Sequence, residues 1–370
     1  MRNRSMVRWA GGLIVAIGVA LYLTISGLAQ APKHQYGASV ARPYTMEDLV
    51  YGRRITYEMA EYRKTPNGPH TPGSEMYKAA QEPFKIASNT YYVGVQGQGS
   101  YLITTPAGHI LIEQPYDQAA GEKIAASIQK LGFKLADIKV MTATEYHNDH
   151  MGATAYLKGL MPNAQLMVME GDVEFVEKGE SIPAVKVDRT LHDREQVVLG
   201  DVTLTAYRIP GHTPGATTFV WQAKENGQTY NVAETCCWSN TPPSHNLISD
   251  PLYPTTLLRH NFEVLKSLSI DIPTPGSHSD HFNKRAKLAA MKANPKVNPW
   301  IAPQDYRGVI AFWEWANEQE ILKQLKEGPP VVAPRGQGRG AAPAPGGAPR
   351  PPSSFPPFPD SPTAVIKIVK

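Results

Sequence analysis

The chain has 370 residues, of which 42% are hydrophobic, so it can bury one large core or two smaller ones. Its formal net charge of +4 is spread along the chain, without a basic stripe interleaved with aromatic residues, which argues against a nucleic acid as partner. The two cysteines are adjacent and cannot form a framework of disulfides.

The N-terminus has the pattern of an export signal. Three arginines precede an apolar run over about residues 11–29, and the small residues Ala29 and Ala31 follow. We therefore expect a secretory signal peptide over residues 1–31, cleaved after Ala31, and a periplasmic or secreted protein. The alternative is an uncleaved membrane anchor, because the run is nearly long enough to span a bilayer.

Residues 32–82 are polar and rich in turn residues, apart from a helix expected from Thr45 to about Glu61. We interpret them as an extension on the outside of the main domain. From Phe84 onward, short β-rich runs alternate with helical periodicity. Strands are predicted at residues 84–86, 90–95, 100–105, 109–113, around 140, 165–169, 190–191, 197–199, 202–207, 217–221 and 229–233, with a turn at residues 200–201. Helices are predicted at residues 119–131, 153–160, 172–178, 257–268 and 310–325.

These elements outline a core domain over residues 83–327, with strands and helices alternating in two successive halves. Such an order predicts an α/β sandwich, with two sheets packed face to face and helices outside. Most of residues 328–370 are Pro, Gly, Ala, Ser and Arg, a composition that cannot bury a core. We predict a disordered, partly polyproline tail, in which residues 363–370 either pair as an edge strand or fray.

One stretch contains a dense set of metal-binding side chains. Glu145, His147, Asp149 and His150 lie within six residues, directly after the apolar run around Val140. On an extended turn alternate residues point the same way, so the first three can converge while His150 approaches from a second direction. The set exceeds what one tetrahedral ion needs, and imidazole with carboxylate favours zinc over calcium or an iron–sulfur cluster.

Two later histidines lie on glycine-containing loops that follow predicted strands. They are His212, within residues 210–215, and His278, within residues 275–282. One such histidine is more often structural than a ligand, but three segments of this kind at strand ends together favour a metal site.

The adjacent Cys236 and Cys237 are expected to be two buried thiols, because a bridge between neighbours is strained. A redox role or a metal-binding role is the alternative.

The ligand-bearing segments resemble those of a known family. Residues 144–150 resemble the HxHxDH signature of the metallo-β-lactamase fold, and the loops with His212 and His278 resemble its later ligand loops. Other segments resemble subclass B3 of the metallo-β-lactamases, namely residues 83–94, 108–113, 191–193, 202–206 and 253–254. The resemblance covers about residues 83–326 and leaves out both terminal regions.

The resemblance implies an αββα sandwich and a zinc-dependent hydrolase that opens the cyclic amide of a β-lactam, a small-molecule substrate. It also implies two zinc ions, the first held by Glu145, His147 and His212, and the second by Asp149, His150 and His278. A hydroxide bridging them would attack the substrate carbonyl, oriented by Asp149. The alternatives are another substrate in the same fold, such as a lactone, thioester or sulfate ester, and a surface binding protein without activity.

The chain departs from the family's usual pattern at three places. Glu145 replaces the first histidine of the signature. Thr235 aligns with a serine of subclass B3, so that Glu234 either bridges the metals or faces water, and Cys236 is a further thiolate ligand candidate. Residues 113–115 are Glu-Gln-Pro where the family often has Asp-Gly-Gly, which gives a stiffer turn.

The carboxylate of Glu145 adds a negative charge to the first zinc and should make it a weaker Lewis acid. We therefore expect activity to need a higher pH or more added zinc than in relatives with three histidines. In the variant Glu145→His, the pH profile of hydrolysis should move to lower pH and the zinc requirement should fall. An unchanged profile and an unchanged requirement would contradict this expectation.

Overall fold

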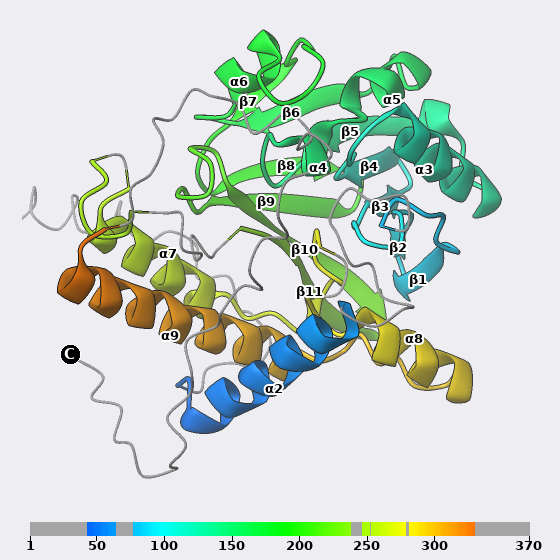
Figure 1. Cartoon of the computed structure of the whole chain (residues 1–370). Helices are drawn as coiled ribbons and strands as arrows, with labels where there is room; N and C mark the ends of the chain where they lie inside the picture. Colours follow the sequence, from blue (N-terminus) through cyan, green and yellow to red (C-terminus); the bar gives the residue numbers. More distant parts are fainter. Residues whose placement is uncertain (1–42, 64–76, 238–245, 252, 279–280, 330–370) are drawn as a thin grey trace, which may run out of the picture. The chain divides into compact units, whose positions relative to one another are not determined.

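The computed structural model describes residues 43–63, 77–237, 246–251, 253–278 and 281–329 (Figure 1). The expected signal peptide over residues 1–31 lies outside these residues. So do residues 32–42 and 64–76 of the extension and all but the first two residues of the predicted tail. Among the helices that the structure describes, none is long and apolar enough to cross a membrane.

Two sheets form the centre of the fold (Figure 1). The first has seven strands in chain order: β1 (Phe84–Ala87), β2 (Thr90–Tyr92), β3 (Tyr101–Thr105), β4 (Gly108–Ile112), β5 (Ile138–Thr142), β6 (Gln165–Met169) and β7 (Arg189–Leu191). Strands β1 to β4 pair antiparallel, and β4 to β7 pair parallel. This mixed order leaves the carboxyl ends of β5 and β6 at one edge.

The second sheet has five strands in the spatial order β12-β11-β10-β9-β8. They are β8 (Glu195–Leu199), β9 (Val202–Arg208), β10 (Thr217–Glu225), β11 (Gln228–Thr235) and β12 (Ile272–Pro273). Pairing is antiparallel except between β11 and β12. The parallel pair brings the loops after β11 and β12 to the same end of the sheet.

The main core lies between the two sheets, where fully buried side chains such as Ile112, Phe219 and Trp221 form one cluster. The indole nitrogen of Trp221 donates a hydrogen bond to the hydroxyl of Thr90 across this interface, at 2.9 Å. A buried indole N–H needs such a partner, because leaving it unpaired costs free energy. The two sheets are therefore held in a fixed relative position behind the site.

Helices cover the outer faces of both sheets. Apolar residues of α3 (Gln118–Lys130), α5 (Thr154–Leu160) and α6 (Val173–Lys178) pack on the first sheet. Those of α2 (Met46–Arg63), α7 (Thr255–Ser267) and α9 (Pro303–Glu327) pack on the second. The predicted α/β sandwich is confirmed.

The predicted elements were found, most with small shifts of their ends, although α9 begins at Pro303, well before the predicted residue 310. Two further elements were missed, the one-turn helix α4 (Asn148–Met151) and helix α8 (Lys284–Ala293), while the strand expected before the loop of His278 is the two-residue β12. A short 3-10 turn, η1 (Leu135–Asp137), precedes β5. Helix α8 was missed because the positions that it buries are occupied by the lysines Lys284 and Lys287, which do not form an apolar pattern.

Helix α2 crosses α9 closely enough that the crossing requires glycine. A Cβ at Gly52 would overlap the backbone of Gly308, and one at Gly308 would meet Tyr51 Cδ1 at 2.8 Å. Beside this contact, the buried guanidinium of Arg307 lies 2.9 Å from the carboxylate of Asp48. The extension thus contributes a helix that packs tightly onto the second sheet's outer layer.

We expect Gly52→Ala to lower the free energy of unfolding by about 1–3 kcal/mol, because overpacking at a tight contact forces the backbones apart. Gly159→Ala is the matched control, since that helical glycine has nothing within 4 Å of an added Cβ. The control should be neutral or stabilising by up to about 1 kcal/mol. Urea denaturation of both variants measures the difference, and equal midpoints would contradict the close crossing.

Candidate metal centre

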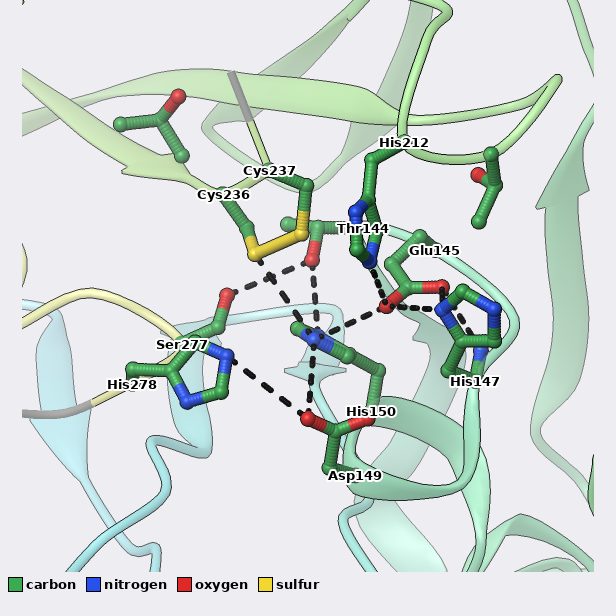
Figure 2. Close-up of a disulfide and its surroundings, with 12 residues drawn as sticks. Thr144, Glu145, His147, Asp149, His150, His212, Cys236, Cys237, Ser277 and His278 are labelled. Carbon is green, nitrogen blue, oxygen red and sulfur yellow. Dashed lines mark hydrogen bonds and ion pairs between the residues drawn. A yellow bond between two sulfur atoms is a disulfide. The ribbon is translucent and has the colours of Figure 1, made fainter. Parts of the chain in front are cut away.

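The six predicted ligands gather at the edge where strands of both sheets end (Figure 2). Glu145 and His147 lie on the turn after β5, and Asp149 and His150 lie in α4, which continues that turn. His212 lies on the β9–β10 loop, and His278 follows β12. The loops of the two sheets are joined by a hydrogen bond from the Thr217 amide to the Thr144 carbonyl, at 2.8 Å.

The predicted second ligand set forms a compact group. Ligand atoms of Asp149, His150 and His278 all lie within 4.8 Å of one another. Asp149 Oδ2 is 3.7 Å from His278 Nε2 and 3.9 Å from His150 Nε2. Three atoms at these separations can converge on one ion, because zinc binds its nitrogen and oxygen ligands at about 2.0–2.2 Å.

Hydrogen bonds orient both histidines of this group. Glu113 Oε2 lies 2.7 Å from His150 Nδ1, and the hydroxyl of Tyr77 lies 3.0 Å from His278 Nδ1. With each Nδ1 engaged, the opposite nitrogen, Nε2, is the one directed at Asp149. Partners of this kind fix the tautomer and the direction of a metal-binding imidazole.

Glu145 lies at the centre of the remaining ligands. Its carboxylate is 2.8 Å from His147 Nδ1, 3.1 Å from His150 Nε2 and 3.6 Å from His212 Nε2. The residue is only 2% exposed. Burial by itself raises the pKa of Glu145, but the attraction of His150 and His147 outweighs it and holds that pKa well below its usual range. The glutamate is therefore ionised and available as a ligand.

The predicted first ligand set is brought together only in part. Ligand atoms of Glu145 and His212 lie within 4.8 Å of each other and of Cys237, whereas His147 contacts Glu145 but does not join a potential metal-binding group among the described residues. The rings of His147 and His212 face each other edge to face, with centroids 5.1 Å apart. Asp172 holds the loop of His212 by accepting hydrogen bonds from the Thr213 hydroxyl, at 2.9 Å, and the Gly215 amide, at 2.7 Å. Burial and the nearby Glu145 raise the pKa of Asp172 to about 7.

The expectation of two free thiols at Cys236 and Cys237 is wrong, because the structure joins them in a disulfide. Strand β11 ends at Thr235, and Cys237 has a left-handed backbone with φ of 61°. In a continued strand the two side chains would point to opposite faces. The change of backbone direction turns both sulfur atoms toward the ligands.

Glu234 has a position that neither sequence interpretation foresaw. It is fully buried and accepts hydrogen bonds from the hydroxyls of Ser277, at 2.6 Å, and Thr274. It is therefore not a water-facing carboxylate, and it belongs to none of the potential metal-binding groups among the described residues. Burial, with Glu113 nearby, raises the pKa of Glu234 to about 8.

Sequence reasoning missed the residues that position the ligands. Glu113 was noted only as a departure from the family, although a carboxylate at a strand end is a recognisable signal. Its carboxylate also accepts hydrogen bonds from the backbone N–H and the hydroxyl of Thr144, at 2.8 and 2.6 Å. Tyr77 gave no signal, because it lies in a turn-rich segment where nothing in the sequence connects it to a histidine 201 residues away.

The donor atoms fit zinc. The cluster offers imidazole nitrogen and carboxylate oxygen, the ligands that zinc accepts in hydrolytic sites. His150 and His278 already have the engaged Nδ1 that orients an imidazole for metal binding through Nε2.

The comparisons with known proteins agree with this fold. Residues 93–225 match the model of the metallo-beta-lactamase superfamily. The native FEZ-1 metallo-beta-lactamase from Legionella gormanii superposes with a TM-score of 0.63 at 33% identity, over 67% of this chain and 98% of that chain. The subclass B3 metallo-beta-lactamase BJP-1 of Bradyrhizobium japonicum gives 0.61 at 33% identity, over 68% and 97%.

A third relative is the N-acyl homoserine lactonase AttM of Agrobacterium fabrum, which is 28% identical over 155 residues. That match spans 32% of this chain and 57% of the lactonase, so it covers little more than half of the relative's length.

Together the fold, the clustered donors and these matches define a metallo-hydrolase. The chain belongs to the metallo-β-lactamase superfamily, and its structural resemblance to subclass B3 is confirmed.

We expect Tyr77→Phe to weaken zinc binding by about 10–100-fold, the range seen when a partner of a metal-binding histidine is removed. Tyr306→Phe is the matched control, because Tyr306 is equally buried and its hydroxyl donates a hydrogen bond to the Leu265 carbonyl, at 2.9 Å, away from the ligands. Competition with a chromogenic chelator measures both affinities. Equal zinc affinity in the two variants would show that Tyr77 does not position His278.

Proposed function

We propose that the protein is a zinc-dependent hydrolase that opens the amide bond of β-lactams. The observation that supports this most strongly is the gathering of six ligand side chains at the sheet edge, in a chain that spans 98% of FEZ-1. In this proposal Glu145, His147 and His212 hold one zinc ion, and Asp149, His150 and His278 hold a second.

Zinc in such a site polarises a carbonyl oxygen and lowers the pKa of water. The side chains of the chain determine where that chemistry takes place. Asp149 is partly exposed and close to His278, so its carboxylate can accept a proton from the attacking water and orient it. Glu113 is buried and holds the imidazole of His150 in place through Nδ1, which keeps the reacting groups aligned.

Hydrolysis of a lactone is the second candidate. It is favoured by the match to AttM, whose name describes an N-acyl homoserine lactonase. The attack on an ester carbonyl uses the same residues, and the two reactions differ in the leaving group, an amine or an alcohol. The β-lactam proposal is preferred because the alignment with FEZ-1 extends over nearly the whole of that enzyme, whereas the match to AttM covers 57% of it.

We also propose that the hydrolase acts outside the cytoplasm. The arginines and the apolar run that precede Ala31 support export through a signal peptide. The small-residue site at Ala29 and Ala31 supports cleavage over retention as an anchor.

The deciding experiment measures turnover of nitrocefin, a carbapenem and an N-acyl homoserine lactone by the zinc-loaded protein, with and without a chelator. We expect turnover of the β-lactams that the chelator abolishes. Lactone turnover without β-lactam turnover would favour the second candidate, and inactivity toward all three would contradict both.

The variant His278→Ala should lose more than about 100-fold in kcat/KM, beyond the usual effect of losing an outer partner of the metal. The matched control is His260→Ala, since His260 is exposed on α7 and forms an ion pair with Glu263 of its own helix. Equal activity of the two variants would exclude His278 from the site.

A further inference from the structure

Two sulfur atoms face the ligand cluster without belonging to either proposed ligand set (Figure 2). Cys236 Sγ lies 3.8 Å from His150 Nε2. Both sulfur atoms lie within 4.8 Å of a ligand nitrogen of His150, and Cys237 is equally close to ligand atoms of Glu145 and His212. One cysteine pair thus borders both proposed metal positions.

The loop geometry makes this approach specific. Cys236 is 1% exposed, at the end of the buried strand β11, and Cys237 is partly exposed. The left-handed φ of 61° at Cys237 is uncommon for a residue with a side chain, and it directs the second sulfur to the same side as the first. The two sulfurs therefore face the cluster together.

The oxidation state of the pair changes what these sulfurs can bind. A thiolate is a strong zinc ligand with a full negative charge, whereas a sulfur in a disulfide has no charge to offer. A reduced Cys236 would lie beside His150, and a reduced Cys237 beside Glu145 and His212. Reduction would add a sulfur donor at one or both metal positions.

We propose that Cys236 and Cys237 are a redox-controlled part of the metal site, binding metal through sulfur when reduced and withdrawing that ligand when joined. This inference rests on the proposed metal site and concerns its regulation. The reductant is a small-molecule thiol. Two thiols lose two hydrogen atoms and form an external disulfide, the Cys236–Cys237 bond breaks, and each cysteine gains one hydrogen. A cysteine sulfur that then binds metal releases its proton to solvent.

The difference in burial between Cys236 and Cys237 determines which cysteine an external thiol attacks first. An attacking thiol reaches Cys237, the partly exposed residue of the pair, before the buried Cys236. Attack there forms a mixed disulfide at Cys237 and leaves Cys236 as the thiolate, 3.8 Å from His150 Nε2. The first product of reduction is thus a new anionic ligand next to the proposed second zinc.

The test compares metal binding by the full-length protein in its oxidised and reduced forms, with alkylation and mass spectrometry to count free thiols. Cobalt titration of the reduced form should give an intense near-ultraviolet sulfur-to-metal band that the oxidised form lacks. Zinc affinity, measured by chelator competition, should be higher in the reduced form by on the order of tenfold or more.

Matched variants separate the sulfurs from other effects of reduction. The double variant Cys236→Ser, Cys237→Ser should bind cobalt without the band and with the same affinity under both conditions. The single variants keep one thiol each, so the band should persist in whichever variant retains the ligating sulfur. Because they cannot form the internal disulfide, they also test the idea if the double variant does not fold.

The outcomes distinguish this inference from the proposed function. Metal binding and hydrolysis that are identical in both redox forms, without a sulfur band, would overturn the redox inference and leave the proposed function standing. Two alkylatable thiols in the oxidised protein would also overturn it. The predicted band and affinity change without hydrolysis of any substrate would support the inference and contradict the proposed function. Absence of metal binding in every form would overturn both.

Discussion

The buried charge of Glu145 is the constraint on which the site depends. Its carboxylate lies within 3.6 Å of nitrogen atoms of His147, His150 and His212, at a depth where it is 2% exposed. An ionised carboxylate is costly to bury unless positive partners compensate for the lost hydration. Without metal those partners are the imidazoles, and Glu113 and Glu145 outweigh burial in raising the pKa of His150. A bound cation would compensate the charge of Glu145 in place of the imidazoles. The residue that departs from the usual ligand pattern therefore favours binding of a metal ion at this position.

The fold brings the ligands together from elements that are distant in sequence. The ligands follow β5, β9 and β12, and the core between the sheets fixes the relative positions of these strand ends. A layer of buried polar groups then sets the direction of each imidazole. Glu113 engages His150, Tyr77 engages His278, and Asp172 holds the loop that carries His212. The described parts of the segment before β1 are thus linked to the site through Tyr77, and to the second sheet through helix α2, which packs on α9.

The sequence predicted the sandwich and the ligand side chains because both leave local signals. Apolar periodicity marked most strands and helices, and six donors stood on loops at strand ends. What it could not predict depends on long-range geometry. The contact between Tyr77 and His278 joins segments without any shared pattern, and the burial of Glu234 depends on Ser277 and Thr274. The Cys236–Cys237 bond was missed because the backbone at Cys237 is left-handed, and no glycine or asparagine at that position indicates such a turn in the sequence.

Anomalous diffraction at the zinc absorption edge, from crystals of the zinc-loaded protein, would locate bound metal directly against these side chains. We expect one peak in contact with Glu145, His147 and His212, and a second in contact with Asp149, His150 and His278. The carboxylate of Glu145 should lie at bonding distance from the first peak, about 2.0–2.2 Å. A single peak at the Asp149 position, with Glu145 still paired to the histidines alone, would contradict a two-metal centre organised around this glutamate.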